Sequence, residues 1–135
     1  MNSLRTIIIV LAAGFAALSA PVLGQRTALA MLDRLESGQW ELRMRDKSGN
    51  VDSICLHNGR QLIQLRHPAR NCHRLIVMDT DTDVIVQYTC PGSGYGRTHI
   101  RRETDRLVQL DSQGIANGSP FAFASEARRV GDCGY

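Results

Sequence analysis

The chain has 135 residues, a length that suits one domain with a modest hydrophobic core. Its 16 Lys and Arg residues against 13 Asp and Glu residues give a formal net charge of +3, and this near balance provides no electrostatic case for nucleic acid as a partner. Four cysteines in so short a chain indicate either a disulfide framework or a metal site.

The N-terminus has the pattern of a secretory signal peptide. Arg5 is the only charged residue of the first 24, an uncharged apolar run covers residues 7–18, and small residues follow. Pro21 interrupts the apolar stretch, which argues against an uncleaved anchor, and no later segment approaches transmembrane length. We therefore expect a signal peptide at 1–24, a single domain at 25–135, and a periplasmic or secreted location.

Two places fit the cleavage of this leader. Val22-Leu23-Gly24 fits a site before Gln25. Ala28-Leu29-Ala30 is a second candidate, which would make Met31 the first residue. The sequence leaves this choice open.

The first element after the leader is a short amphipathic helix. Thr27 is a candidate N-cap and Ser37-Gly38 provides the end. Between them, apolar residues recur at helical spacing at Ala28, Met31, Leu32 and Leu35. We expect this helix to lie on a sheet.

Two strands and a second helix follow. Residues 39–46 alternate apolar and polar side chains, as in a half-buried strand, and a polar turn leads to a second strand at 51–56. The pattern then changes to a helical one over residues 58–67. We expect a short helix here, capped by Asn58 and ended by Pro68.

The rest of the chain consists of strands separated by turns. The predicted strands cover residues 73–78, 84–89, 95–103, 106–111 and 121–127, and the predicted turns cover 79–83, 91–94, 113–114 and 117–120. The expected fold is mainly β, an antiparallel curved sheet or open barrel of about seven strands, with a short N-terminal helix and one short helix after the second strand. The best core candidates are Trp40, Leu42, Met44, Ile76, Val86, Tyr88, Phe121 and Phe123.

The four cysteines all follow the leader, and an even number in an exported domain favours disulfides. Spacing alone does not choose among the three possible pairings. A hairpin symmetric about Asp81 would place Met78 opposite Val84, Ile76 opposite Val86, Arg74 opposite Tyr88, and Cys72 opposite Cys90. Cross-strand neighbours are close enough for a disulfide. We therefore pair Cys72 with Cys90 and, by elimination, Cys55 with Cys133.

Metal binding is the rival interpretation of these cysteines. Cys55-Leu56-His57 and Cys72-His73 put Cys and His close together, but the paired spacing typical of zinc sites does not occur. The aspartates at 79, 81 and 83 resemble the start of a calcium loop, yet Val84 stands at its sixth position and Cys90 at its twelfth. We predict neither a metal nor a cofactor.

Several motifs taken in order resemble one bacterial exported family. They are Leu35-Glu36-Ser37-Gly38-Gln39-Trp40-Glu41-Leu42-Arg43, then Cys55, Cys72 and Cys90, and the tail Arg128-Arg129-Val130-Gly131-Asp132-Cys133. The set is similar to the domain-of-unknown-function family 3617, with its signal peptide, Gly-x-Trp-Glu first strand, four cysteines and closing Gly-Asp-Cys. The resemblance implies an exported β-rich domain, and it implies no activity or catalytic residue.

One strand carries a candidate binding surface. Arg97, His99, Arg101 and Glu103 share a face by alternation, and Arg102 and Arg106 are near in sequence. We list Arg97, Arg101 and Arg102 as a possible anion-binding face. The alternative is that these residues simply form the solvent-exposed face of a half-buried sheet, where charged side chains are common.

No catalytic residue is predicted, because the histidines and serines are scattered without a nucleophile motif. The expected function is a non-catalytic binding or envelope-associated role with an unknown partner. One alternative is a lipocalin-like carrier with a small apolar ligand between helix 28–36 and the sheet. A second is a surface binder of anionic glycan or lipid, and a third is an enzyme with His99 beside a carboxylate in a cleft.

Overall fold

A computed structural model describes residues 28–68 and 71–134 of the protein. The protein is built on one seven-stranded antiparallel sheet that does not close into a barrel. The sheet order is β2-β1-β7-β6-β5-β4-β3, which confirms the predicted fold class. The predicted signal peptide and the Thr27 cap lie outside the described residues. The strands are β1 (Gly38–Met44), β2 (Val51–Leu56), β3 (His73–Asp79), β4 (Asp83–Cys90), β5 (Gly94–Thr104), β6 (Leu107–Ala116) and β7 (Ser119–Gly131).

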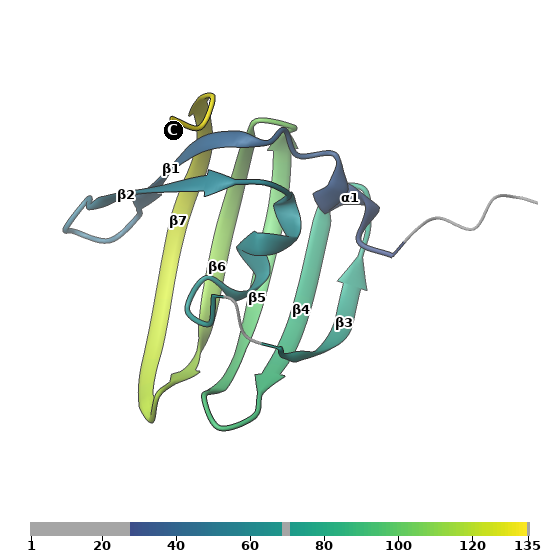
Figure 1. Cartoon of the computed structure of the whole chain (residues 1–135), viewed down its shortest axis with the longest axis vertical. Helices are drawn as coiled ribbons and strands as arrows, with labels where there is room; N and C mark the ends of the chain where they lie inside the picture. Colours follow the sequence, from purple (N-terminus) through teal and green to yellow (C-terminus); the bar gives the residue numbers. More distant parts are fainter. Residues whose placement is uncertain (1–27, 69–70, 135) are drawn as a thin grey trace, which may run out of the picture.

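The sheet joins the two ends of the domain. Strands β3 to β7 follow one another as a meander, each pairing with the next. Strand β1 then pairs with β7, so that the C-terminal strand lies inside the sheet, and β2 and β3 form its two edges. In Figure 1, β1 and β2 cross the upper end of the molecule at a steep inclination to β4, which shows how strongly the sheet curves.

Both described helices lie on the same face of this sheet (Figure 1). They are α1 (Ala30–Asp33) and the 3₁₀-helix η1 (Gly59–Gln64). No helix in the described part of the chain is long and apolar enough to cross a membrane. The buried side chains of α1 and η1 pack in one core with those of the sheet. The helices contribute Met31, Leu32, Leu62 and Ile63, and the sheet contributes Trp40, Leu42, Val84, Val86, Ile100, Val108 and Leu110.

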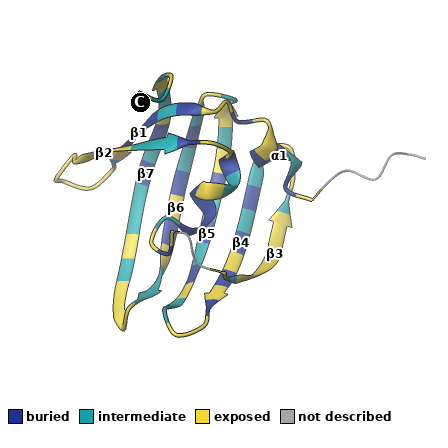
Figure 2. Ribbon diagram, in the orientation of Figure 1, coloured by how far each residue is buried: buried dark blue, intermediate teal, exposed yellow. Residues whose placement is uncertain are grey.

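The other face of the sheet, called the outer face below, has no covering element among the described residues. Figure 2 shows buried residues alternating with more exposed ones along β4, β5 and β6. Because successive side chains of a strand point to opposite faces, the more exposed set belongs to the outer face. A sheet with one covered and one open face is common in antiparallel folds.

Local chemistry explains both helices. Asn58 caps η1 as predicted, since its Oδ1 accepts from the backbone N–H of Arg60 at 3.0 Å and Gln61 Oε1 accepts from the N–H of Asn58 at 3.1 Å. The N-terminal helix is shorter than expected, because Leu29 adopts a left-handed conformation with φ 61°. The backbone N–H of Leu29 instead donates to Asp79 Oδ2 at 2.8 Å.

Both predicted disulfides are present. Cys72 is bonded to Cys90, with Cα atoms 4.2 Å apart, and Cys55 is bonded to Cys133 across 78 positions of sequence. The hairpin register is confirmed for Ile76 opposite Val86 and for Arg74 opposite Tyr88. A bulge at Val77 changes the rest, so that Met78 lies opposite Ile85 and not Val84. An extra residue in one strand is what shifts a register in this way.

The predicted turn at residues 113–114 is wrong. Residues 113–114 are not a turn, because β6 runs through to Ala116 and the chain reverses at Asn117-Gly118, both with positive φ. Gly114 lies opposite Gly96, and a Cβ at Gly114 would stand 2.1 Å from the Tyr95 carbonyl oxygen. This glycine thus serves a close approach of backbones.

The predicted core also needs correction. Trp40, Leu42, Val86 and Tyr88 are buried as expected. Phe121 and Phe123 are only partly buried, and Ile76 is exposed because β3 is an edge strand.

Candidate functional site

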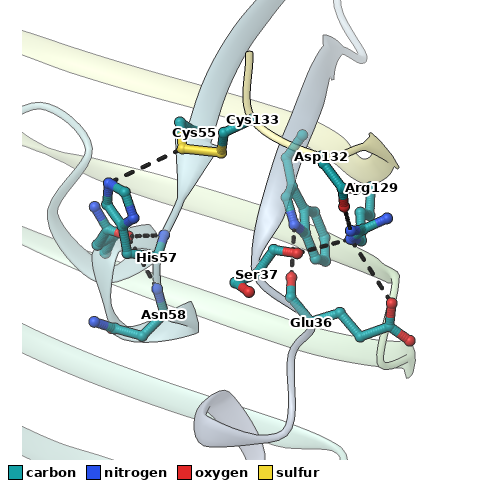
Figure 3. Close-up of a disulfide and its surroundings, with 10 residues drawn as sticks. Glu36, Ser37, Cys55, His57, Asn58, Arg129, Asp132 and Cys133 are labelled. Carbon is teal, nitrogen blue, oxygen red and sulfur yellow. Dashed lines mark hydrogen bonds and ion pairs between the residues drawn. A yellow bond between two sulfur atoms is a disulfide. The ribbon is translucent and has the colours of Figure 1, made fainter. Parts of the chain in front are cut away.

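Three of the motifs that carry the family resemblance, the 35–43 segment, Cys55 and the 128–133 tail, meet at one corner of the fold (Figure 3). Arg129 Nε donates to the carbonyl oxygen of Ser37 at 2.8 Å, and Arg129 Nη2 donates to Asp132 Oδ1. Trp40 Nε1 donates to the carbonyl oxygen of Glu36 at 2.9 Å. Beside them, Cys133 is bonded to Cys55. These residues join the start of β1 to the end of β7, which is a structural role.

Cys55 in β2 and His57 just after this strand do not form a metal centre with further described residues. Cys55 Sγ lies 4.0 Å from His57 Nε2, but this sulfur is bonded to Cys133. Within residues 28–68 and 71–134, no group of three His, Cys, Asp or Glu side chains has the arrangement of a metal site.

The space between helix α1 and the sheet is filled. A groove of about 760 Å³ lies on the same side beside η1, where Ile54, Leu65 and Pro68 line it together with Arg60, Gln64 and Arg74. Met31, Leu32, Leu62 and Ile63 are completely buried in the region where a carrier would need its apolar pocket. A polar cluster lies beside them, in which His67 contacts the Tyr88 hydroxyl at 3.2 Å through Nδ1 and the Ser93 carbonyl oxygen at 3.0 Å through Nε2. These polar contacts are internal to the packed side of the sheet.

The titration of this cluster follows from its burial. Burial raises the pKa of the Tyr88 hydroxyl above its usual value. Burial also lowers the pKa of Arg74, with help from the nearby charge of Arg60. Arg74, an exposed residue of the edge strand β3, donates to Gln64 Oε1 at 2.8 Å, so its guanidinium has a neutral partner.

The structure separates the three arginines of the predicted anion-binding face. Arg97 and Arg101 lie on the outer face, as the alternation indicates. Arg102 lies on the opposite face with a side chain only 15% exposed, where it pairs with Asp105 at 2.9 Å and donates to the Asp81 carbonyl oxygen at 3.2 Å. Arg102 therefore does not share a surface with the other two.

Two shallow grooves cross the outer face, one on each side of Arg97. The first groove has a volume of about 720 Å³ and runs between two rows of cross-strand neighbours. One row consists of His73, Thr89 and Tyr95, and the other of Leu75, Gln87, Arg97, Gln113 and Ala122. The second has a volume of about 570 Å³ and is lined by Arg97, Gln113 and Ala122 together with Arg45, His99 and Asp111. We call the first the Arg97 groove.

Arg97 differs from the other arginines of this face in its neighbours. Its cross-strand partners are two neutral amides, Gln87 on β4 and Gln113 on β6. Among the described residues no carboxylate is paired with its guanidinium. By contrast, Arg45 pairs with Asp111 at 2.9 Å, Arg101 with Glu103 at 3.5 Å and Arg128 with Glu126 at 3.3 Å.

His99 lies in the second groove beside a carboxylate, as the enzyme alternative requires. Its Nε2 is 2.8 Å from Asp83 Oδ1, and the Thr82 hydroxyl donates to Asp83 Oδ2 at 2.7 Å. The hydrogen bond from Thr82, followed by that from His99, lowers the pKa of Asp83. The His99 side chain is 40% exposed. Ser112 also lines this groove, but its hydroxyl lies on the packed side of the sheet, 2.8 Å from Thr98 Oγ1. Within the described chain this geometry gives His99 no activated nucleophile.

Comparison of the sequence with known protein families and with curated proteins, and of the fold with solved structures, finds no match. The candidate site therefore depends on its own geometry. Alternation along β5 located Arg97 and Arg101, whereas Gln87 and Gln113 carried no signal of their own. Only the pairing of β4, β5 and β6 brings the two amides to either side of Arg97.

Proposed function

We propose that the protein is an exported, non-catalytic binding domain that takes an anionic group at Arg97 on the outer face of its sheet. Export to the periplasm or the cell exterior is supported by the leader pattern of residues 1–24 and is consistent with the two disulfides. Membership of the exported family that the motifs resemble is part of the same proposal.

The observation that carries the binding site is the setting of Arg97. Arg97 is a partly buried residue on an open face, between two grooves and two amides, and no described carboxylate pairs with its guanidinium. A guanidinium presents a planar fork of donors that fits carboxylate or phosphate oxygens in pairs. An anion in the groove would therefore find a charge partner that the fold leaves available.

Nuclear magnetic resonance of the mature protein tests this proposal. At low ionic strength we expect sodium galacturonate or inorganic phosphate to shift the Arg97 Nε–Hε signal and the backbone amides of Gln87 and Gln113. Arg97→Gln should abolish the shifts of the Gln87 and Gln113 backbone amides. The matched control is Arg128→Gln, on the same face but paired with Glu126, which should leave them unchanged. Equal shifts in the Arg97→Gln protein would refute the site.

A further inference from the structure

We infer that the ligand of the Arg97 groove is an acidic oligosaccharide that lies across the strands, an inference that rests on the function proposed above. The groove follows cross-strand rows from β3 to β7. Neighbouring strands are about 4.8 Å apart, so five strands offer a path of roughly 19 Å. Such a path suits an extended chain of several units better than a single small anion.

The side chains along the groove match a sugar acid in chemistry. Gln87 and Gln113 can each donate and accept hydrogen bonds, as sugar hydroxyls do, and Thr89 adds a hydroxyl. Tyr95, on the same strand as Arg97, is 55% exposed and offers an aromatic surface with a polar end. With Arg97 between the amides, the groove combines a site for one carboxylate with sites for neutral, polyhydroxylated units.

The charge distribution argues against an anionic membrane as the partner. Electrostatic attachment to a lipid surface depends on clusters of basic residues. On this face Arg45, Arg101 and Arg128 already have carboxylate partners. Arg43 of β1 lies opposite Glu126, but that carboxylate pairs with Arg128, so within the described chain Arg43 has no ion pair either. The two arginines of this face without a described carboxylate partner, Arg43 and Arg97, are thus three strands apart, and such sparse charge fits a ligand of low charge density.

Calorimetric titration of the mature protein with defined probes tests the inference. The probes are tetragalacturonate, its methyl-esterified neutral form, galacturonate monomer, inorganic phosphate, and vesicles of phosphatidylglycerol and phosphatidylcholine. We expect tetragalacturonate to bind at least tenfold more tightly than the monomer. The neutral form and the vesicles should show no binding.

Two substitutions check the geometry. Arg97→Gln should abolish binding of the tetramer. Tyr95→Ser should weaken it roughly fivefold to tenfold, whereas Tyr95→Phe should retain it, because stacking needs only the ring. Val130→Ser, at another exposed apolar position of the sheet, is the control that should change nothing.

The outcomes separate the two proposals. If phosphate or monomer binds through Arg97 as tightly as the tetramer, the oligosaccharide inference fails and the anion site stands. Vesicle binding without tetramer binding would overturn the inference in favour of lipid. If no anion depends on Arg97, both proposals fall.

Discussion

At the scale of single residues, Ser125 is exceptional within the described chain. Its hydroxyl is buried on the packed side of β7 without a hydrogen-bond partner. An unsatisfied buried hydroxyl costs about 1–3 kcal/mol of desolvation. We therefore expect Ser125→Ala to raise the free energy of unfolding by about 1 kcal/mol, measured as an increase in the urea midpoint at constant slope.

Ser112 provides the matched control for this prediction. It is also a buried serine on the packed side of the sheet, but its hydroxyl lies 2.8 Å from Thr98 Oγ1. Ser112→Ala should lower the free energy of unfolding by about 1 kcal/mol, because a buried hydrogen bond is lost. A loss of stability in Ser125→Ala similar to that in Ser112→Ala would show that the hydroxyl of Ser125 is satisfied.

At the scale of elements, the junction of β1 and β7 depends on a glycine. Gly38 has φ +143°, and a Cβ there would stand 2.4 Å from the Gly131 carbonyl oxygen and 2.7 Å from Arg129 Nε. We expect Gly38→Ala to reduce the free energy of unfolding by roughly 2–3 kcal/mol, from backbone strain and from displacement of Arg129. Urea unfolding monitored by Trp40 fluorescence measures the change.

Gly131 tests whether this effect belongs to the position or to the loss of any glycine. It lies at the same junction, but a Cβ on Gly131 meets nothing within 4 Å. Gly131→Ala should therefore be nearly neutral. If the two alanine variants lose the same stability, the close approach at Gly38 is not what the junction requires.

How far the elements could be predicted depends on the range of the interactions that form them. Alternation places Trp40 and Leu42 on the buried face, and Asn58 marks the start of η1, because both patterns are local. The bulge at Val77 has no such signal, since one extra residue leaves the apolar run unchanged. The sequence pattern predicts a turn at Gly114 because the real constraint on this residue, the backbone of β5, is distant in sequence.

At the scale of the whole molecule, pairings that are distant in sequence decide both the topology and the site. The placement of β1 beside β7 joins the two ends of the domain, and the Cys55–Cys133 bond reinforces that junction. Closing a loop of that length contributes about 4 kcal/mol in the chain-entropy account. The Arg97 groove is likewise formed by residues of five strands. Alternation within one strand therefore predicts the arginine face, but it does not predict the amides that neighbouring strands place beside Arg97.

The same long-range contacts decide between the two cleavage sites of the proposed leader. Leu29 is 3% exposed within the core, its N–H donates to Asp79, and the Ala28 carbonyl accepts from Arg60 Nη2 at 2.8 Å. A chain that begins at Met31 loses all three contacts. We therefore predict that the exported protein begins at Gln25, which its intact mass will show.

Purified chains test the reason behind this choice of first residue. A chain that begins at Met31 should be less stable to urea than one that begins at Gln25 by about 2 kcal/mol, the value of burying a leucine side chain. A chain that begins at Ala28 keeps Leu29 and the Ala28 carbonyl, so it should match the longer one. Equal stability of the Met31 and Gln25 chains would remove the energetic argument. An exported protein whose intact mass corresponds to a chain starting at Met31 would contradict the prediction directly. The domain would then fold without Leu29, whose N–H connects the start of α1 to Asp79 at the end of β3.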